Sequence, residues 1–218
     1  MAAQIVSVVP DEPRHDRILQ AAGLLAGGSI VAIPTETFYG LAADPFNTDS
    51  LKALNRLKEK EEDAPILLLL GNRAMADQVA ENLSDKFQAL ARAFWPGPLT
   101  LVVRASSAVP REVSGGRGTV GIRVPGLALP RNLATALGRP ISGVSSNRHR
   151  RPPHRTALEV FNEFPQGIDM ILDGGPTPGG APSTIVDLSE DRARVIRRGT
   201  LPVKVLAPFL PGLEPENG

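Results

Sequence analysis

Side chains that could bind a small polar molecule gather at four places in the sequence, each beside an apolar segment. The segment "PTET" (34–37) follows one apolar run, "RVP" (123–125) and "SSN" (145–147) follow two others, and "PST" (182–184) leads into a fourth. Serine, threonine and asparagine make short, directional hydrogen bonds. Because ligands of open α/β sheets bind in the crevice beyond the strand ends, we expect these segments to converge on one site.

Four cationic side chains, one of them within these segments, could serve an anionic ligand. They are Lys58, Lys60, Arg123 and Arg197. Lysine and arginine make charge-assisted hydrogen bonds to carboxylate and phosphate groups. The phosphate-binding pattern GxxxxGK[ST] is absent from the sequence, and we expect no ordinary dinucleotide-binding fold. The residues therefore predict a site for a small molecule that carries a carboxylate or a phosphate.

The elements that must position these residues alternate along the chain, which predicts one α/β domain with a mixed sheet. Helices are predicted at 14–26, 47–60, 131–137 and 156–161, with two more between 71 and 94, the second capped by Ser84. The helix at 47–60 is expected to begin at a Thr48 or Asp49 cap. Strands are predicted at 5–9, 30–33, 66–70, 99–103, 119–124, 141–145, 170–172, 184–188 and 194–196.

Composition limits the classes of protein that the chain can belong to. Its 218 residues carry a net charge of only +1, so nucleic acid or membrane contacts would have to use local patches. There is no cysteine, which excludes disulfides and thiolate chemistry and fits a reducing cytosol. No run approaches the roughly 20 apolar residues that a membrane helix needs. We expect a soluble, cytoplasmic protein with no membrane association, folded as a single domain over residues 1–210 with a flexible tail at 211–218.

Eight motifs, in order and spacing, resemble the YrdC-like family of L-threonylcarbamoyladenylate synthases. They are "PTETFYGLAAD", "KEKEEDAPILLL", "FWPGPLTLVV", "TVGIRVP", "PISGVSSN", "DGG", "PSTIVDL" and "VIRRG", which together cover roughly residues 15 to 200. The resemblance implies a twisted mixed β-sheet with flanking helices around a basic concave cleft. It also implies an enzyme, a nucleotidyltransferase that joins L-threonine, bicarbonate or CO2 and ATP into threonylcarbamoyl-AMP and releases pyrophosphate.

The resemblance also implies roles for individual residues. Those matched to contacts with L-threonine are Thr35, Thr37, Tyr39, Arg123 and Ser183. Those matched to the nucleotide side are Lys58, Lys60, Thr119, Ser145, Asn147 and Arg197, of which Lys58, Lys60, Ser145 and Asn147 are also predicted to be catalytic. No protein metal ligand is expected, because Mg²⁺ would be held largely by the ATP phosphates. Partner proteins would then transfer the threonylcarbamoyl group to adenosine in tRNA.

Two segments depart from the family pattern and keep other functions open. The usual Lys-x-Arg-Pro is Lys58-Glu59-Lys60-Glu61 here, and a basic loop, "RHRRPPHR" (148–155), follows Asn147. We expect this loop to fold over ATP, although it could instead contact RNA phosphates or be a solvated basic loop. The alternative function is a YrdC-like protein that binds RNA or the ribosome without chemistry. A carbamoyltransferase acting on another acceptor is a weaker third possibility.

Overall fold

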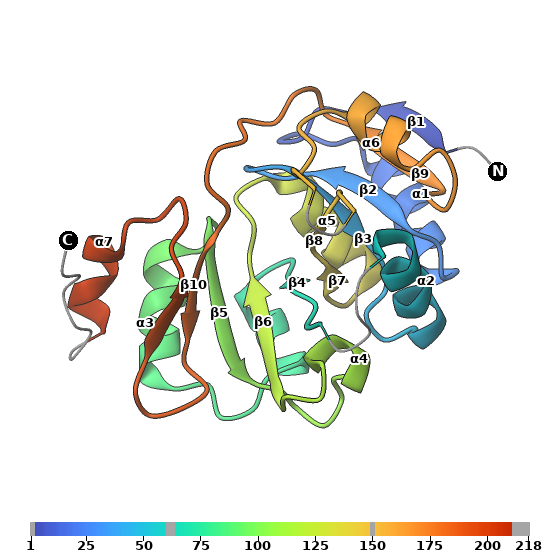
Figure 1. Ribbon diagram of the computed structural model, residues 1–218. Coiled ribbons are helices and arrows are strands. Elements are labelled where there is room, and N and C mark those ends of the chain that lie inside the picture. Colours follow the sequence, from blue (N-terminus) through green and yellow to red (C-terminus); the bar gives the residue numbers. More distant parts are fainter. Residues whose placement is uncertain (1–2, 60–63, 149–150, 211–218) are drawn as a thin grey trace.

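The computed structural model describes residues 3–59, 64–148 and 151–210, which form helices and strands in alternation (Figure 1). The α-helices are α1 His15–Ala26, α2 Thr48–Lys58, α3 Asp85–Phe94, α4 Arg111–Ser114, α5 Ala128–Leu137, α6 Ala157–Glu163 and α7 Val203–Leu206. Two 3-10 helices span Arg73–Gln78 and Ala207–Phe209. The predicted mixed α/β class is confirmed, and the predicted tail at 211–218 lies outside the described residues.

The strands are divided between two mixed sheets instead of forming one. The first has the order β1-β9-β2-β3-β8 and the second the order β11-β10-β5-β6-β4-β7. Strands of the first sheet are β1 Gln4–Ser7, β2 Val31–Pro34, β3 Tyr39–Ala42, β8 Val144–Ser145 and β9 Met170–Asp173. Strands of the second are β4 Leu68–Leu69, β5 Leu99–Arg104, β6 Thr119–Arg123, β7 Ile141–Ser142, β10 Thr184–Asp187 and β11 Arg194–Arg197.

The chain crosses from one sheet to the other at Gly143. Residues 141–145 were predicted as one strand, and this is wrong: β7 pairs with β4 in the second sheet, whereas β8 pairs with β3 in the first. A Cβ at Gly143 would lie 2.5 Å from Cγ of Leu69, so only glycine fits this crossing. The Ser142 hydroxyl joins the sheets by accepting from Ala43 N and donating to Leu41 O. After this crossing, Ser145 of the "SSN" segment pairs with Gly40 of β3 in the first sheet.

Local signals explain most element ends. Ser84 accepts a hydrogen bond from Phe87 N and caps α3 as predicted. Helix α2 is capped by Asn47, which accepts from the backbone N–H groups of Asp49 and Ser50, so the predicted Thr48 or Asp49 cap is wrong by one or two positions. Helix α2 ends at Lys58, with Glu59 in the left-handed conformation, and the Lys58 side chain contacts the segment at 145–147, which begins in β8 of the first sheet.

Two clusters of buried apolar side chains hold the elements together. The larger is shared by both sheets and includes α1, α3 and α5, while the smaller packs α6 and part of α2 on the first sheet. Packing of α1 against α5 is one of the main helix contacts. In the part of the chain that the structure describes, no helix has both the length and the apolar character needed to cross a bilayer.

Candidate active site

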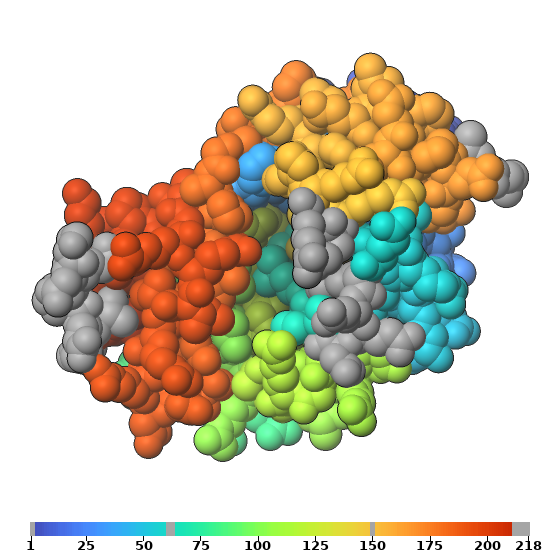
Figure 2. All heavy atoms as spheres, viewed as in Figure 1, coloured from blue at the N-terminus to red at the C-terminus, as the bar shows by residue number. Residues whose placement is uncertain are grey.

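A cavity of about 550 Å³ lies where the polar strand ends meet, within the size range of small-molecule sites. Figure 2 shows the surface hollowed in this region, between the C-terminal strands and the N-terminal half of the chain. The predicted site residues that line it are Thr35, Thr37, Tyr39, Lys58, Thr119, Arg123, Ser145, Asn147, Ser183 and Arg197. The predicted convergence of the four segments is therefore observed. Lys60 lies outside the described residues.

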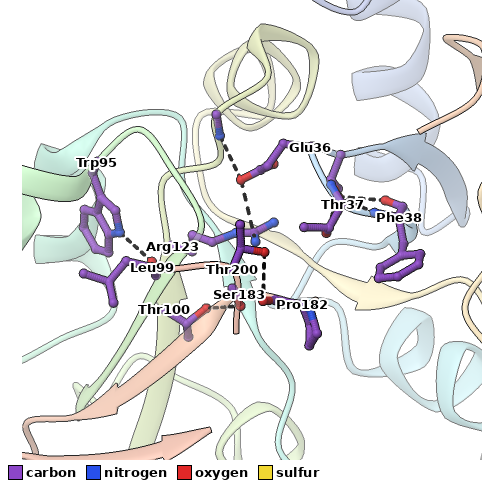
Figure 3. Close-up of polar contacts among 12 residues, drawn as sticks. Glu36, Thr37, Phe38, Trp95, Leu99, Thr100, Arg123, Pro182, Ser183 and Thr200 are labelled. Atoms are coloured by element: carbon purple, nitrogen blue, oxygen red, sulfur yellow. Dashed lines mark hydrogen bonds and ion pairs between the residues drawn. The ribbon is translucent and has the colours of Figure 1, made fainter. Parts of the chain in front are cut away.

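Two pairs of hydroxyls line one part of the cavity. Thr35 and Thr37, in the turn between β2 and β3, have their Oγ1 atoms 3.1 Å apart, and Thr35 also donates to Phe38 O. In the second pair, Oγ1 of Thr100 on β5 lies 2.8 Å from Oγ of Ser183 (Figure 3). All four of these side chains are buried. Because a hydroxyl both donates and accepts, each pair retains capacity for one more polar group.

Two arginine side chains line the same cavity. Arg123 ends β6 and is buried, with Nη1 3.7 Å from Oε1 of Glu36. Arg197, at the end of β11, donates from Nε and Nη2 to Ser183 O and from Nη2 to Ser183 Oγ. Burial lowers the pKa of Arg123, and burial followed by the nearby charge of Arg123 lowers the pKa of Arg197. Both pKa shifts arise because burial removes water from a cation. A site that holds two such cations favours an anionic ligand.

Lys58 also lines the cavity. Its side chain is buried, and Nζ donates to the carbonyl oxygens of Ser145 and Asn147. The Asn147 amide nitrogen donates to Arg148 O and Arg151 O, which leaves its Oδ1 buried without a protein partner. An unpartnered buried acceptor is costly unless a ligand donor reaches it. The lysine thus fixes the loop that presents Ser145 and Asn147 to the cavity.

Tyr39 contributes to the wall of the cavity, but its phenol is bound inside the protein. The hydroxyl donates to Gly175 O at 2.9 Å, lies 3.3 Å from Oδ1 of Asp173 and accepts from Gly174 N. Burial, together with the Asp173 charge, raises the pKa of Tyr39 from 10.0 to about 12. The side chain therefore ties the "DGG" turn to β3.

Tyr39 gives a prediction that spectroscopy can test. Because the folded-state pKa is raised, the unfolded chain loses its proton first, and the free energy of unfolding should fall as the pH rises from about 10 to about 12. Tyr39 is the only tyrosine of the chain, so tyrosinate absorbance in the near ultraviolet reports it alone. Tyr39→Phe, compared over the same pH range, should lack this part of the decline. A midpoint at the ordinary tyrosine value would contradict the buried hydrogen-bonded phenol.

The basic loop after Asn147 is held against α6. Arg148 pairs with Glu59 and Glu163, and Arg151 pairs with Glu163 at 3.5 Å. His154 O also accepts from Tyr39 N, which fixes the end of the loop. Residues 149–150 lie outside the described residues, and neither Arg148 nor Arg151 is among the side chains that line the cavity. The expectation that this loop covers ATP stays a prediction.

Several lining residues were not predicted from the sequence. Thr100 and Asp187 each stand inside an apolar strand, which is the signal that could have identified them, and Arg117 adds a further cation. Asp187 accepts from Ser189 and lies 3.9 Å from Arg194. The run Gly116–Gly121 has the spacing GxGxxG, but it leads from a turn into β6 and not from a strand into a helix, so it lacks the dinucleotide-binding context.

Among the described residues that line it, the cavity combines cations with hydroxyl and amide groups, and Asp187 is the one carboxylate in that set. Among the residues that the structure describes, no group of three His, Asp or Glu side chains is placed to hold a metal ion. Arg123 can grip a carboxylate, and Lys58, Arg117 and Arg197 can face phosphates. The site suits an anion that carries both kinds of group.

Comparison with known proteins identifies the family. The profile of the Sua5, YciO and YrdC proteins, described as "Telomere recombination", matches residues 8–199. The chain belongs to this family.

Relatives with curated names agree on one activity. The chain is 36% identical over 188 residues to threonylcarbamoyl-AMP synthase of Pyrococcus abyssi, covering 86% of this chain and 55% of the relative. It is 32% identical over 199 residues to the putative threonylcarbamoyl-AMP synthase of Mycobacterium tuberculosis, covering 91% of each. The chain thus spans about half the length of the Pyrococcus relative, and also of the one from Bacillus subtilis, where it covers 53%.

Solved structures share the fold closely. The crystal structure of P. abyssi Sua5 complexed with L-threonine has a TM-score of 0.91 and 33% identity, covering 96% of this chain and 61% of that one. The crystal structure of E. coli YciO has a TM-score of 0.85 and 25% identity, covering 95% of this chain and all of the other. The implied YrdC-like fold is therefore confirmed.

Proposed function

We propose that this chain synthesises L-threonylcarbamoyl-AMP from L-threonine, bicarbonate or CO2, and ATP, with release of pyrophosphate. The observation that carries the proposal is that one cavity is lined by a buried arginine, by four buried hydroxyls, and by Lys58, Ser145 and Asn147. Arg123 is suited to the carboxylate of an amino acid, and Thr37 and Ser183 line the same cavity. Names of the curated relatives and the threonine complex of P. abyssi Sua5 support the same assignment.

The reaction needs positioning and charge neutralisation more than covalent help. The threonine nitrogen, as the free amine, attacks the carbon of bicarbonate or CO2 to form a carbamate. Water leaves when bicarbonate reacts, and a proton leaves the nitrogen when CO2 reacts. A carbamate oxygen then attacks the α-phosphorus, and the bond to the bridging oxygen breaks as pyrophosphate leaves. Lys58, Arg117 and Arg197 would offset the charge of the triphosphate. We propose no protein nucleophile.

In this proposal Mg²⁺ binds together with the substrate ATP, as MgATP, and the phosphates hold most of its coordination sites. Among the described lining residues the carboxylate is Asp187, which accepts from Ser189 and lies 3.9 Å from Arg194, and these contacts support a site in which the nucleotide holds the ion. Transfer of the product to tRNA by partner proteins, direct contact of the chain with tRNA and a cytoplasmic location remain predictions.

One assay tests the proposed function. The purified chain is incubated with radiolabelled bicarbonate, MgATP and L-threonine, and the products are separated to find a labelled AMP adduct. We expect the adduct and pyrophosphate to form together, and only when threonine and bicarbonate are both present. The proposal would be overturned if pyrophosphate release did not depend on threonine, or if no adduct formed under any of these conditions.

A further inference from the structure

Glu36 lies behind Arg123 and was not among the predicted site residues. Its Oε1 accepts from Gly126 N at 3.1 Å and pairs with Nη1 of Arg123 at 3.7 Å (Figure 3). The side chain of Arg123 is only 5% exposed and that of Glu36 19% exposed. Glu36 does not line the cavity, so it can reach a ligand only through the arginine.

The pair is incomplete on both sides. Nε of Arg123 and Oε2 of Glu36 are buried, and neither has a hydrogen-bond partner in the protein. A carboxylate and a guanidinium that formed a bidentate fork would satisfy two donors at once, whereas here one oxygen serves both Arg123 and Gly126. The arginine therefore keeps donor capacity while its charge is partly offset.

A second guanidinium lies near this pair. The charge of Arg123 contributes to lowering the pKa of Arg197, whereas the ion pair shown for Glu36 is with Arg123. A buried charge without a nearby opposite charge carries a large desolvation cost. A ligand carboxylate would supply the second negative charge, and it would compete with Glu36 for the same guanidinium.

We propose that Glu36 is a positioning residue that acts as an internal counter-ion to Arg123. It holds the guanidinium charged and directed toward the cavity before a ligand arrives, and it lowers the affinity of the empty site for simple anions. This inference rests on the proposed carboxylate site at Arg123. It assigns Glu36 a role in selectivity, because a monocarboxylate alone must overcome the counter-ion without the further contacts available to an amino acid.

Glu36→Gln is the direct test, because the amide oxygen can still accept from Gly126 N while the charge is lost. The variant should have a lower Tm than the natural protein and should bind acetate about tenfold more tightly, since removing one repelling charge at this range is worth about that factor. Acetate binding is measured by calorimetry and by the rise in Tm, at constant ionic strength. Unchanged or weaker acetate binding in E36Q would overturn the proposal.

Asp44→Asn is the matched control. Asp44 is another buried carboxylate that pairs with an arginine, Arg139, at 3.4 Å, and neither residue lines the cavity. D44N should have a lower Tm than the natural protein, as E36Q should. Added acetate should raise the Tm of D44N by no more than it raises the Tm of the natural protein. An equal acetate rescue of both variants would mean that the effect is a general response to anions and would contradict the proposal.

A second variant and a second ligand keep the test decisive. If E36Q does not fold, Glu36→Asp is the second variant, because it keeps the charge on a shorter side chain. It should bind acetate severalfold more tightly than the natural protein does. Unchanged acetate affinity in E36D would contradict the role of Glu36 as a counter-ion. L-threonine is titrated in parallel. Failure of threonine to bind the natural protein, with the acetate pattern intact, would defeat the proposed substrate and leave the role of Glu36 standing.

Discussion

Replacing Arg123 with alanine is expected to raise the L-threonine concentration needed for half-maximal pyrophosphate release far more than the ATP concentration. A charge-assisted contact to a carboxylate is worth about 1.5–3 kcal/mol, which corresponds to roughly a ten- to hundredfold loss of affinity. Arg123 is buried at the cavity and is matched to this contact, whereas Lys58, Ser145 and Asn147, which line the same cavity, are matched to the nucleotide. The measurement is initial-rate kinetics with each substrate varied in turn.

Two control variants separate binding from folding. Arg123→Ala leaves Glu36 buried without its cation, so part of any loss could come from the fold. The double variant R123A/E36Q removes both charges and should recover stability without recovering threonine affinity. Arg123→Lys should rescue only partly, because an ammonium cannot reproduce the guanidinium fork. An equal loss for threonine and ATP in the stable double variant would argue against a carboxylate contact at Arg123.

Residues near the ends of apolar runs were predictable because their surroundings are local. Thr35, Thr37, Arg123 and Ser183 each adjoin a strand whose apolar character is plain in the sequence, and the structure brings all of them to one cavity. Ser84 was recognised as a cap for the same reason, since its partner lies three residues away. Local patterns of this kind need no knowledge of the tertiary fold.

What the sequence could not predict depends on contacts between distant segments. Glu36 pairs with Arg123 across 87 positions, and Lys58 contacts the carbonyl of Ser145 across the same number, so neither partnership leaves a local signal. The break at Gly143 depends on the Leu69 side chain, which blocks any Cβ there. Strand β3 was missed because Tyr39 and Gly40 follow a turn rich in polar residues and because its pairing partners are β2 and the short β8. Division of the strands between two sheets follows from these same contacts.

Replacing Lys58 with methionine is expected to weaken ATP binding and slow pyrophosphate formation by roughly ten- to hundredfold, while threonine binding stays nearly unchanged. The reason is that the variant keeps the buried stem but loses an ammonium whose charged hydrogen bonds are worth about 1.5–3 kcal/mol. Lys58 Nζ donates to the carbonyl oxygens of Ser145 and Asn147, so its charge is held beside two residues that are predicted to contact the nucleotide. Calorimetry with ATP and with L-threonine measures the two affinities separately.

AMP distinguishes the two ways in which Lys58 could act. A lysine that neutralises the triphosphate should matter for ATP and much less for AMP, which lacks the β- and γ-phosphates. A lysine that only anchors the 145–147 loop would weaken both nucleotides equally, because Ser145 and Asn147 would shift for either. We expect the ATP-selective loss. Lys52→Met, an exposed lysine on the same helix α2, serves as the matched control and should leave all three affinities unchanged. If K58M weakened the affinities for AMP and ATP equally, Lys58 would act only by anchoring the 145–147 loop.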